Sequence, residues 1–172
     1  MIKVTDNGCG MDKSDAEICL NQHTTSKIQE IDDLFNIDSL GIRGEALASI
    51  FSVSNFGLIT KKEKNVSGVE IKKQGNGFEL NEVGAPDGTS VKVSDLFYNV
   101  PARKKYLKTL VTEFNHIVDL FLNYCLAYSA VEWQLIHNNK VVYHGSNKTF
   151  SSPAADLGTP DYSDLLLDNY IS

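Results

Sequence analysis

Apolar and polar residues alternate along several short stretches of the chain, which is the period-two pattern of half-buried β-strands. These stretches lie at residues 3–5, 55–60, 68–72, 78–80 and 89–93. Turn-forming residues fill the connections at 61–65 and 74–77, so the strands that they join are predicted to pair antiparallel as a meander.

Helical spacing of apolar residues marks the other regular segments. Residues 12–21 open with Asp12 and Ser14 as candidate caps, and the acids that follow suit the positive end of a helix dipole. Strong helix formers follow Gly44 at once. Residues 112–127 place apolar side chains on one broad helical face, which predicts a helix packed along that face.

The composition changes near Ser129, which marks a predicted domain boundary. Residues 131–137 alternate, Asn138-Asn139 turns the chain, and residues 140–144 alternate again, so a β-hairpin is predicted. This hairpin lacks a partner sheet, and residues 146–163 are rich in Ser, Pro, Asp and Gly and are predicted to be loose. The two predicted domains are residues 1–129 and 130–172, the second incomplete.

Composition and charge are those of a globular protein and do not indicate a membrane span, a secretion signal or a strongly basic nucleic-acid-binding chain. The sequence is 42% hydrophobic and 22% charged, has no apolar run near the roughly 18–20 residues of a membrane span, and starts without a signal-peptide pattern. Three cysteines, two of them in apolar contexts and none in a CxxC pair, predict reduced, buried thiols in a cytosolic protein and no metal site. The net charge of −6 means that nucleic acid would have to meet a local basic patch. Residues 102–110 are such a basic stretch, although a solvated helix face is the favoured interpretation.

The run Val4-Thr5-Asp6-Asn7-Gly8-Cys9-Gly10-Met11 places an acid, an amide and two glycines directly after the first strand. The carboxylate of Asp6 can accept a hydrogen bond from a ligand's amino group. Gly8 and Gly10 can adopt backbone angles closed to other residues, and without side chains they let a flat ring lie close. An ordinary Asn-Gly turn explains the same residues, and from this run alone both interpretations stay open.

Two later segments are candidates for phosphate contact. His23-Thr24-Thr25-Ser26-Lys27 offers hydroxyls, N–H groups and an ammonium, although a helix-capping loop is the favoured interpretation of these residues alone. Gly41, Arg43 and Gly44 directly precede a helix, whose first N–H groups and dipole suit an anion. This is not a P-loop, because no Lys-Ser/Thr pair follows the second glycine.

Taken in order, these segments resemble the N-terminal ATPase region of MutL-type DNA mismatch repair proteins, within the family shared by gyrase B, the large heat-shock chaperones and histidine kinases. The resemblance covers roughly residues 2–145 and rests on the runs 6–11, 24–28, 41–50, 88–89, 95–107, 112–117 and 137–140. The runs Gly-Ile-Arg-Gly-Glu-Ala-Leu and Phe-Tyr-Asn-Val-Pro-Ala-Arg are specific to MutL-like members.

The resemblance implies an α+β fold. The expected architecture is a two-layer α/β sandwich with a mixed, mostly antiparallel sheet of the histidine-kinase-like ATPase type. The start of a second α/β domain, of the ribosomal-protein type, is expected to follow.

The resemblance also implies roles in binding ATP. Asp6 would accept the adenine amino group, Gly8 and Gly10 would shape the base pocket, and Thr89 would support it with its hydroxyl. The lid over the nucleotide would contain Thr24, Thr25, Ser26 and Lys27. The phosphates would lie against Gly41, Arg43, Gly44, Glu45, Ala46 and Leu47.

Family members carry a glutamate, the general base, and an asparagine that holds Mg2+ on a helix before the first strand. Both are expected upstream of Met1, so no catalytic residue is expected within the chain, and Glu17 and Glu45 do not replace the base. A missing general base costs typically about 10²–10⁴-fold in rate. Without that helix, an uncovered sheet edge and a tendency to aggregate are also expected.

The function implied by the resemblance is DNA mismatch repair, in which ATP binding and hydrolysis drive a clamp-like change that couples mismatch recognition to repair. The implied partners are a MutS-type mismatch recognition protein, DNA bound non-specifically through basic patches, and a second copy of the complete protein. The location would be cytoplasmic, or nuclear in a eukaryote. The alternative is a nucleotide-binding or interaction fragment without ATPase activity. A sensor-kinase domain is not favoured, because no phosphoacceptor histidine helix is present.

Overall fold

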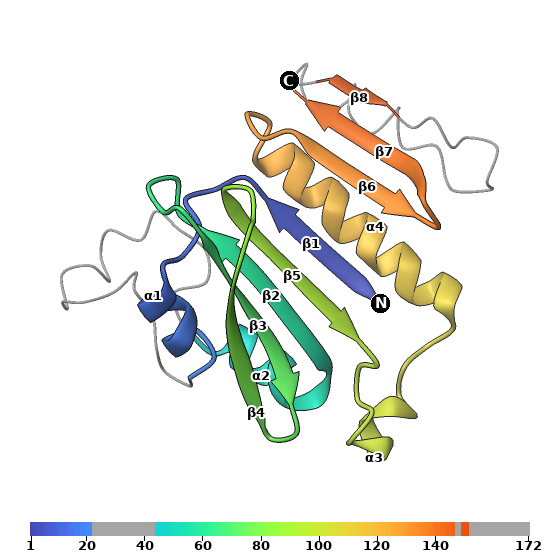
Figure 1. Ribbon diagram of the computed structural model, residues 1–172. Helices are drawn as coiled ribbons and strands as arrows, with labels where there is room; N and C mark the ends of the chain where they lie inside the picture. Colours follow the sequence, from blue (N-terminus) through green and yellow to red (C-terminus); the bar gives the residue numbers. More distant parts are fainter. Residues whose placement is uncertain (22–43, 147–148, 152–172) are drawn as a thin grey trace, which may run out of the picture. The chain divides into compact units, whose positions relative to one another are not determined.

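The computed structural model describes residues 1–21, 44–146 and 149–151, and the chain divides into two compact units. The first unit spans Met1–Tyr106 and the second Leu107–Ser172. Figure 1 shows the course of the chain through both units.

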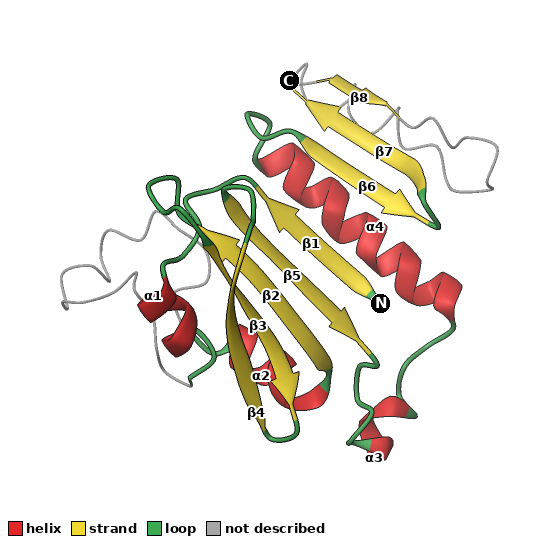
Figure 2. Cartoon of the chain, in the orientation of Figure 1, coloured by secondary structure: helices red, strands yellow, loops and turns green. Residues whose placement is uncertain are grey.

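A five-stranded sheet forms the centre of the first unit (Figure 2). Its strands are β1 (Ile2–Asp6), β2 (Asn55–Lys61), β3 (Gly68–Gln74), β4 (Gly77–Val83) and β5 (Gly88–Ser94). The spatial order is β1-β5-β2-β3-β4, and every strand pair among the described residues is antiparallel. The predicted meander is confirmed as β2, β3 and β4, and the predicted strands at 3–5 and 89–93 are confirmed as β1 and β5.

The described residues of this unit form three helices, α1 (Lys13–Ile18), α2 (Ala46–Val53) and α3 (Pro101–Lys104). Asp12 caps α1 as predicted, because its side chain accepts a hydrogen bond from the Asp15 N–H. Helix α1 ends at Ile18 and is therefore shorter than the predicted segment 12–21. Leu20, beyond its end, packs into the apolar core with only 8% of its surface exposed. The basic segment 102–110 does not form one helix either, because Thr109 caps the helix that follows.

Helices α1 and α2 cover one face of the sheet, which is the expected two-layer arrangement (Figure 2). Alternate residues of β2 and β3 supply the strand side of the core, and α1 supplies Ala16 and the following turn Leu20. Leu47, Ile50 and Phe51 of α2 pack against this core and are partly buried. The core residues of the two strands are Phe56, Leu58, Val69 and Ile71.

The second unit contains α4 (Leu110–Ala127), β6 (Trp133–His137), β7 (Lys140–Ser146) and β8 (Thr149–Ser151). The predicted hairpin is confirmed as β6 and β7, which pair antiparallel. Val118 of α4 and Val142 and Tyr143 of β7 form its core. Because α4 packs on this hairpin, the two units divide after Tyr106, whereas the sequence pattern placed the domain boundary after Ser129.

The segment 146–163 was predicted to be loose, and this is wrong for residues 149–151, which pair with β7 as β8. Backbone hydrogen bonds to an adjacent strand order these residues despite their polar composition. The start of a second domain at residue 130 stays a prediction. Among the helices of the described ranges, none combines the length and apolar character that crossing a bilayer requires.

All three cysteines are free. Burial raises the pKa of the Cys19 thiol to about 11 and that of the Cys125 thiol to about 11. Cys9 is exposed and therefore differs from the buried thiols that the sequence pattern suggested.

Candidate functional site

Strand register brings three polar residues together at one end of the sheet. Asp6, the last residue of β1, lies opposite Thr89 of β5, and Thr89 lies opposite Thr60 of β2. Two of the predicted site residues, Asp6 and Thr89, are therefore adjacent although 83 positions separate them in the sequence. Antiparallel pairing of β5 with β1 on one side and β2 on the other causes this juxtaposition.

The carboxylate of Asp6 is oriented by the backbone. Its Oδ1 atom accepts hydrogen bonds from the N–H groups of Gly8, at 2.9 Å, and Thr89, at 3.2 Å. Within the described ranges the second oxygen, Oδ2, accepts no hydrogen bond, and the side chain is exposed. A carboxylate accepts hydrogen bonds at both oxygens, so a ligand's N–H donor can still be accepted here.

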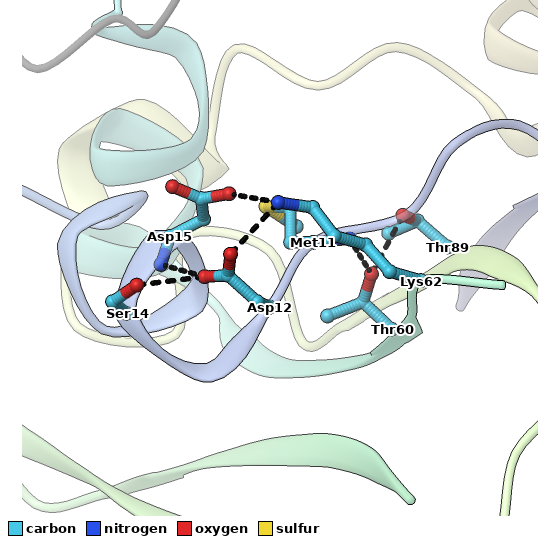
Figure 3. A network of polar contacts seen from close by, with 7 residues as sticks. All are labelled: Met11, Asp12, Ser14, Asp15, Thr60, Lys62 and Thr89. Carbon is cyan, nitrogen blue, oxygen red and sulfur yellow. Dashed lines mark hydrogen bonds and ion pairs between the residues drawn. The ribbon is translucent and has the colours of Figure 1, made fainter. Parts of the chain in front are cut away.

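Thr60 and Thr89 form a hydroxyl pair (Figure 3), and Thr89 lies opposite Asp6 in the sheet. Their Oγ1 atoms are 3.0 Å apart, and the buried Thr60 hydroxyl also accepts from the Met11 N–H at 2.8 Å and donates to the Gly88 carbonyl at 3.2 Å. With its one hydrogen donated to Gly88, Thr60 accepts the hydrogen of Thr89, whose oxygen lone pairs remain as acceptors. Thr60 was not predicted from the sequence, although a hydroxyl at an inward position of an apolar strand was the available signal.

The glycines of the site allow close backbone contact. Gly10 has a φ of 62°, and a Cβ atom there would lie 2.0 Å from the Lys61 carbonyl oxygen. A Cβ atom at Gly8 would lie 3.0 Å from Asp6 Oδ1. Gly88, which was not assigned a role from the sequence, has a φ of 104° and touches the backbone of Asp6. Gly10 and Gly88 therefore hold the turn after β1 against the neighbouring strand ends at a distance and with backbone angles that favour glycine.

An ion-pair cluster fixes the start of α1 to the residue that follows β2 (Figure 3). Lys62 Nζ lies 2.8 Å from Asp12 Oδ2 and 2.9 Å from Asp15 Oδ2. The hydrogen bond from Lys62, followed by those from the Asp15 N–H and the Ser14 hydroxyl, holds the pKa of Asp12 well below its usual range. The two carboxylates raise the pKa of Lys62 in turn. The cluster joins the end of β2 to the start of α1 and was not predicted from the sequence.

The predicted phosphate segment is described only from Gly44 onward. Gly44 adopts a φ of 64°, and the helix predicted to follow it is confirmed as α2, which begins at Ala46 with Glu45 as its N-cap residue. The Glu45 side chain makes no capping hydrogen bond to the first turn, which includes Leu47. The first N–H groups of a helix lack intrahelical acceptors and suit an anion. The remaining predicted residues, Thr24, Thr25, Ser26, Lys27, Gly41 and Arg43, lie outside the described residues.

No family model matches the chain. Comparison with curated proteins finds DNA mismatch repair protein MutL of Pelodictyon phaeoclathratiforme, 43% identical over 145 residues, which are 84% of this chain and 23% of that protein. MutL of Syntrophobacter fumaroxidans is 48% identical over 143 residues, which are 83% of this chain and 21% of that protein. This chain belongs to the MutL family. The chain spans about a quarter of the length of the curated MutL proteins that it matches.

Solved structures place the match within the MutL protein. The ATPase domain of Aquifex aeolicus MutL, complexed with ADP, superimposes with a TM-score of 0.66 at 30% sequence identity. The superposition covers 86% of this chain and 52% of that chain. The family and the region predicted from the sequence motifs are therefore confirmed: the chain corresponds to the N-terminal ATPase region of MutL.

Proposed function

We propose that this chain binds the adenine nucleotide of a MutL-type mismatch repair protein at the end of β1. The single observation that carries the proposal is the oriented carboxylate of Asp6, which holds two backbone N–H groups on Oδ1 and keeps Oδ2 for a ligand. In this proposal Oδ2 accepts the adenine amino group. The resemblance to a MutL ATPase domain that was solved with ADP supports the same ligand.

The other residues of the site take roles that fit their surroundings. Thr89 accepts from the purine or from a bound water through its hydroxyl, and Thr60 holds that hydroxyl in place. Gly8 and Gly10 keep the turn thin enough for a flat ring. We assign the phosphates to the segment from Gly41 to Leu47 and the lid to residues 24–27.

Hydrolysis needs a general base and a metal ion. Among the residues that the structure describes, no group of three or more His, Cys, Asp and Glu side chains could hold a metal ion. The described residues therefore do not fit the Mg2+ ion that the family implies. Nucleotide binding without hydrolysis by this chain is the second candidate. This candidate is supported by the absence, within the described part of the chain, of a side-chain cluster that could hold the metal ion which hydrolysis needs.

In the whole protein, we propose that ATP binding and hydrolysis drive a clamp-like change that couples mismatch recognition to repair. A MutS-type protein, DNA and a second copy of the protein would be the partners, and the cytoplasm the location. The exposed basic residues Arg103, Lys104 and Lys105 are the candidate contact for DNA.

The test is calorimetric titration of the purified chain with ADP and ATP. The variant Asp6→Asn is expected to abolish binding and leave the far-UV circular dichroism unchanged. An asparagine that keeps its oxygen on the Gly8 and Thr89 N–H groups would present its NH2 group to the adenine amino group, donor against donor. The matched control is Asp119→Asn on α4, which removes one exposed carboxylate from the other unit and should bind normally.

Unchanged ADP affinity in Asp6→Asn would remove Asp6 from the site. Steady-state ATP turnover by the chain alone would exclude the second candidate, binding without hydrolysis.

A further inference from the structure

The carboxyl end of α2 has an unusual set of hydrogen-bond partners. The last carbonyl groups of a helix have no intrahelical donor, and α2 ends on Ser-Val-Ser without a glycine cap. Nevertheless, every carbonyl from Ile50 to Ser54 accepts a hydrogen bond from a side chain or from a different element. The donors are Ser54 Oγ to Ile50, Lys73 Nζ to Phe51, Ser52 and Ser54, Asn99 Nδ2 to Ser52, and the Phe97 N–H to Val53.

Lys73 is the principal donor, and it occupies a position of β3 where an apolar residue is expected. Val69 and Ile71 point from β3 into the core, and Lys73 follows them on the same face. Its Nζ atom lies 2.5, 3.2 and 3.0 Å from the carbonyl oxygens of Phe51, Ser52 and Ser54. An ammonium has three hydrogens, so this group is fully used. Its positive charge also suits the negative end of the helix dipole.

A strained turn supplies the remaining donors. Asp95 and Phe97 have φ values of 49° and 62°, and such backbone angles are strained for a bulky residue such as Phe97. The surrounding bonds hold the turn in this conformation. The Phe97 N–H lies 2.6 Å from the Val53 oxygen, Asn99 Nδ2 lies 2.9 Å from the Ser52 oxygen, and Asn55 donates to Asp95 at 2.7 Å.

The same turn contributes an aromatic ring. The Tyr98 ring lies 5.3 Å from Lys73 Nζ on one side, and the Phe51 ring of α2 lies 4.9 Å away. Rings at these distances attract a cation and restrict the lysine to one geometry. The Phe-Tyr-Asn part of the motif that is specific to MutL-like members therefore converges with Lys73 on one helix end.

We propose that Lys73, Phe97 and Asn99 form an α2 clamp that positions the opposite end of this helix for the nucleotide phosphates. The proposal rests on the proposed function, in which Gly44 to Leu47 contact phosphate. Helix α2 has eight residues and is about 12 Å long, so it tilts as one rigid body. A displacement at its clamped end moves the N–H groups at its start, and misplacement by about 1 Å can cost about 10²-fold where geometry matters.

The experiment compares ADP with adenosine, because adenosine carries the purine and no phosphate. The full chain and its variants Lys73→Met and Asn99→Ala are titrated with each compound. We expect Lys73→Met to weaken ADP binding about tenfold or more and to leave adenosine binding within about twofold. The matched control is Lys72→Met, the neighbouring lysine, which is exposed and pairs with Glu70 at the surface. It should leave both affinities unchanged.

Hydrogen exchange of the α2 amides, residues 46–53, provides a readout that does not require nucleotide. Exchange should be faster in Lys73→Met and Asn99→Ala than in the unsubstituted chain, and unchanged in Lys72→Met. If Lys73→Met does not fold by circular dichroism, Asn99→Ala decides, because it removes a single exposed donor.

Equal losses for ADP and adenosine would assign the three residues a merely structural role and overturn the proposal. An unchanged ratio of the two affinities together with unchanged exchange in α2 would do the same. If the unsubstituted chain binds adenosine and not ADP, or neither, the proposed function fails. Exchange then still decides whether the clamp holds α2.

Discussion

At the scale of single residues, the site depends on side chains whose hydrogen-bond partners the local sequence does not predict. Asp6 was predicted from its position beside glycines, and the structure adds that two N–H groups fix its Oδ1 atom. No role was predicted for Thr60 from the sequence, because threonine is common in strands. In the structure Thr60 is fully buried, and its hydroxyl hydrogen-bonds both the Met11 N–H and the Thr89 hydroxyl at the ends of the strands.

Replacing Thr60 by valine tests this position. The change keeps the side-chain shape and removes the acceptor of the Met11 N–H, so a buried donor loses its partner. We expect the free energy of unfolding to fall by about 1–3 kcal/mol, measured by urea denaturation. The control Thr5→Val removes an exposed hydroxyl that pairs with Ser90 in the same sheet, and should cost less than about 0.5 kcal/mol. Equal losses in both variants would contradict the role assigned to Thr60.

At the scale of secondary-structure elements, caps and ion pairs determine how α1 joins the sheet. Asp12 was predicted as a cap from its position before a helix, and the same carboxylate also binds Lys62. The second contact could not be predicted, because 50 residues separate the partners and nothing local to Lys62 indicates its direction. The contacts of Lys73 could not be predicted either, because its carbonyl partners at the end of α2 lie at least 19 positions away in the sequence.

The cluster around Lys62 predicts a pH dependence of stability. A lowered folded-state pKa means that the contribution of Asp12 is complete above its ordinary value of 3.8 and is lost as pH falls toward the folded value. A raised folded-state pKa means that the contribution of Lys62 is complete below its ordinary value of 10.5 and is lost as pH rises beyond it. The variant Lys62→Met should therefore lower the urea midpoint at pH 7, and the difference from the unsubstituted chain should shrink at pH 2.5.

Lys64→Met is the matched control, because Lys64 is exposed and lies two residues further along the same loop. It should leave the midpoint unchanged at both values of pH. A difference for Lys62→Met that stays constant between pH 7 and pH 2.5 would contradict the predicted linkage.

At the scale of the whole molecule, the described sheet has β1 at one edge, with Ile2 48% and Val4 64% exposed. Both lie in register with Val93 and Val91 of β5, so they extend the face on which the core is built. An edge strand with exposed apolar residues can pair with another chain. Aggregation therefore stays a prediction that the structure now locates at β1.

Placing a lysine at Val4 is expected to reduce aggregation, because a charge on an edge strand opposes pairing with another edge. Light scattering at increasing protein concentration measures the effect. Val66→Lys is the matched control, since Val66 is fully exposed in the loop between β2 and β3 and the same charge is added away from an edge. If both variants lowered scattering equally, added charge would explain the result and edge pairing would not.

The sequence by itself determined the elements and the family. Hydrophobic period, caps and turn residues act within a few positions, so β1 to β5, the start of α2 and the hairpin β6–β7 could be predicted from local pattern. Only the tertiary structure decided which side chains meet. The pairing of Asp6 with Thr89, the burial of Thr60, and the contacts of Lys62 and Lys73 all join residues at least 19 positions apart. Strand order and helix placement fix such contacts, and these depend on how the whole apolar face is buried.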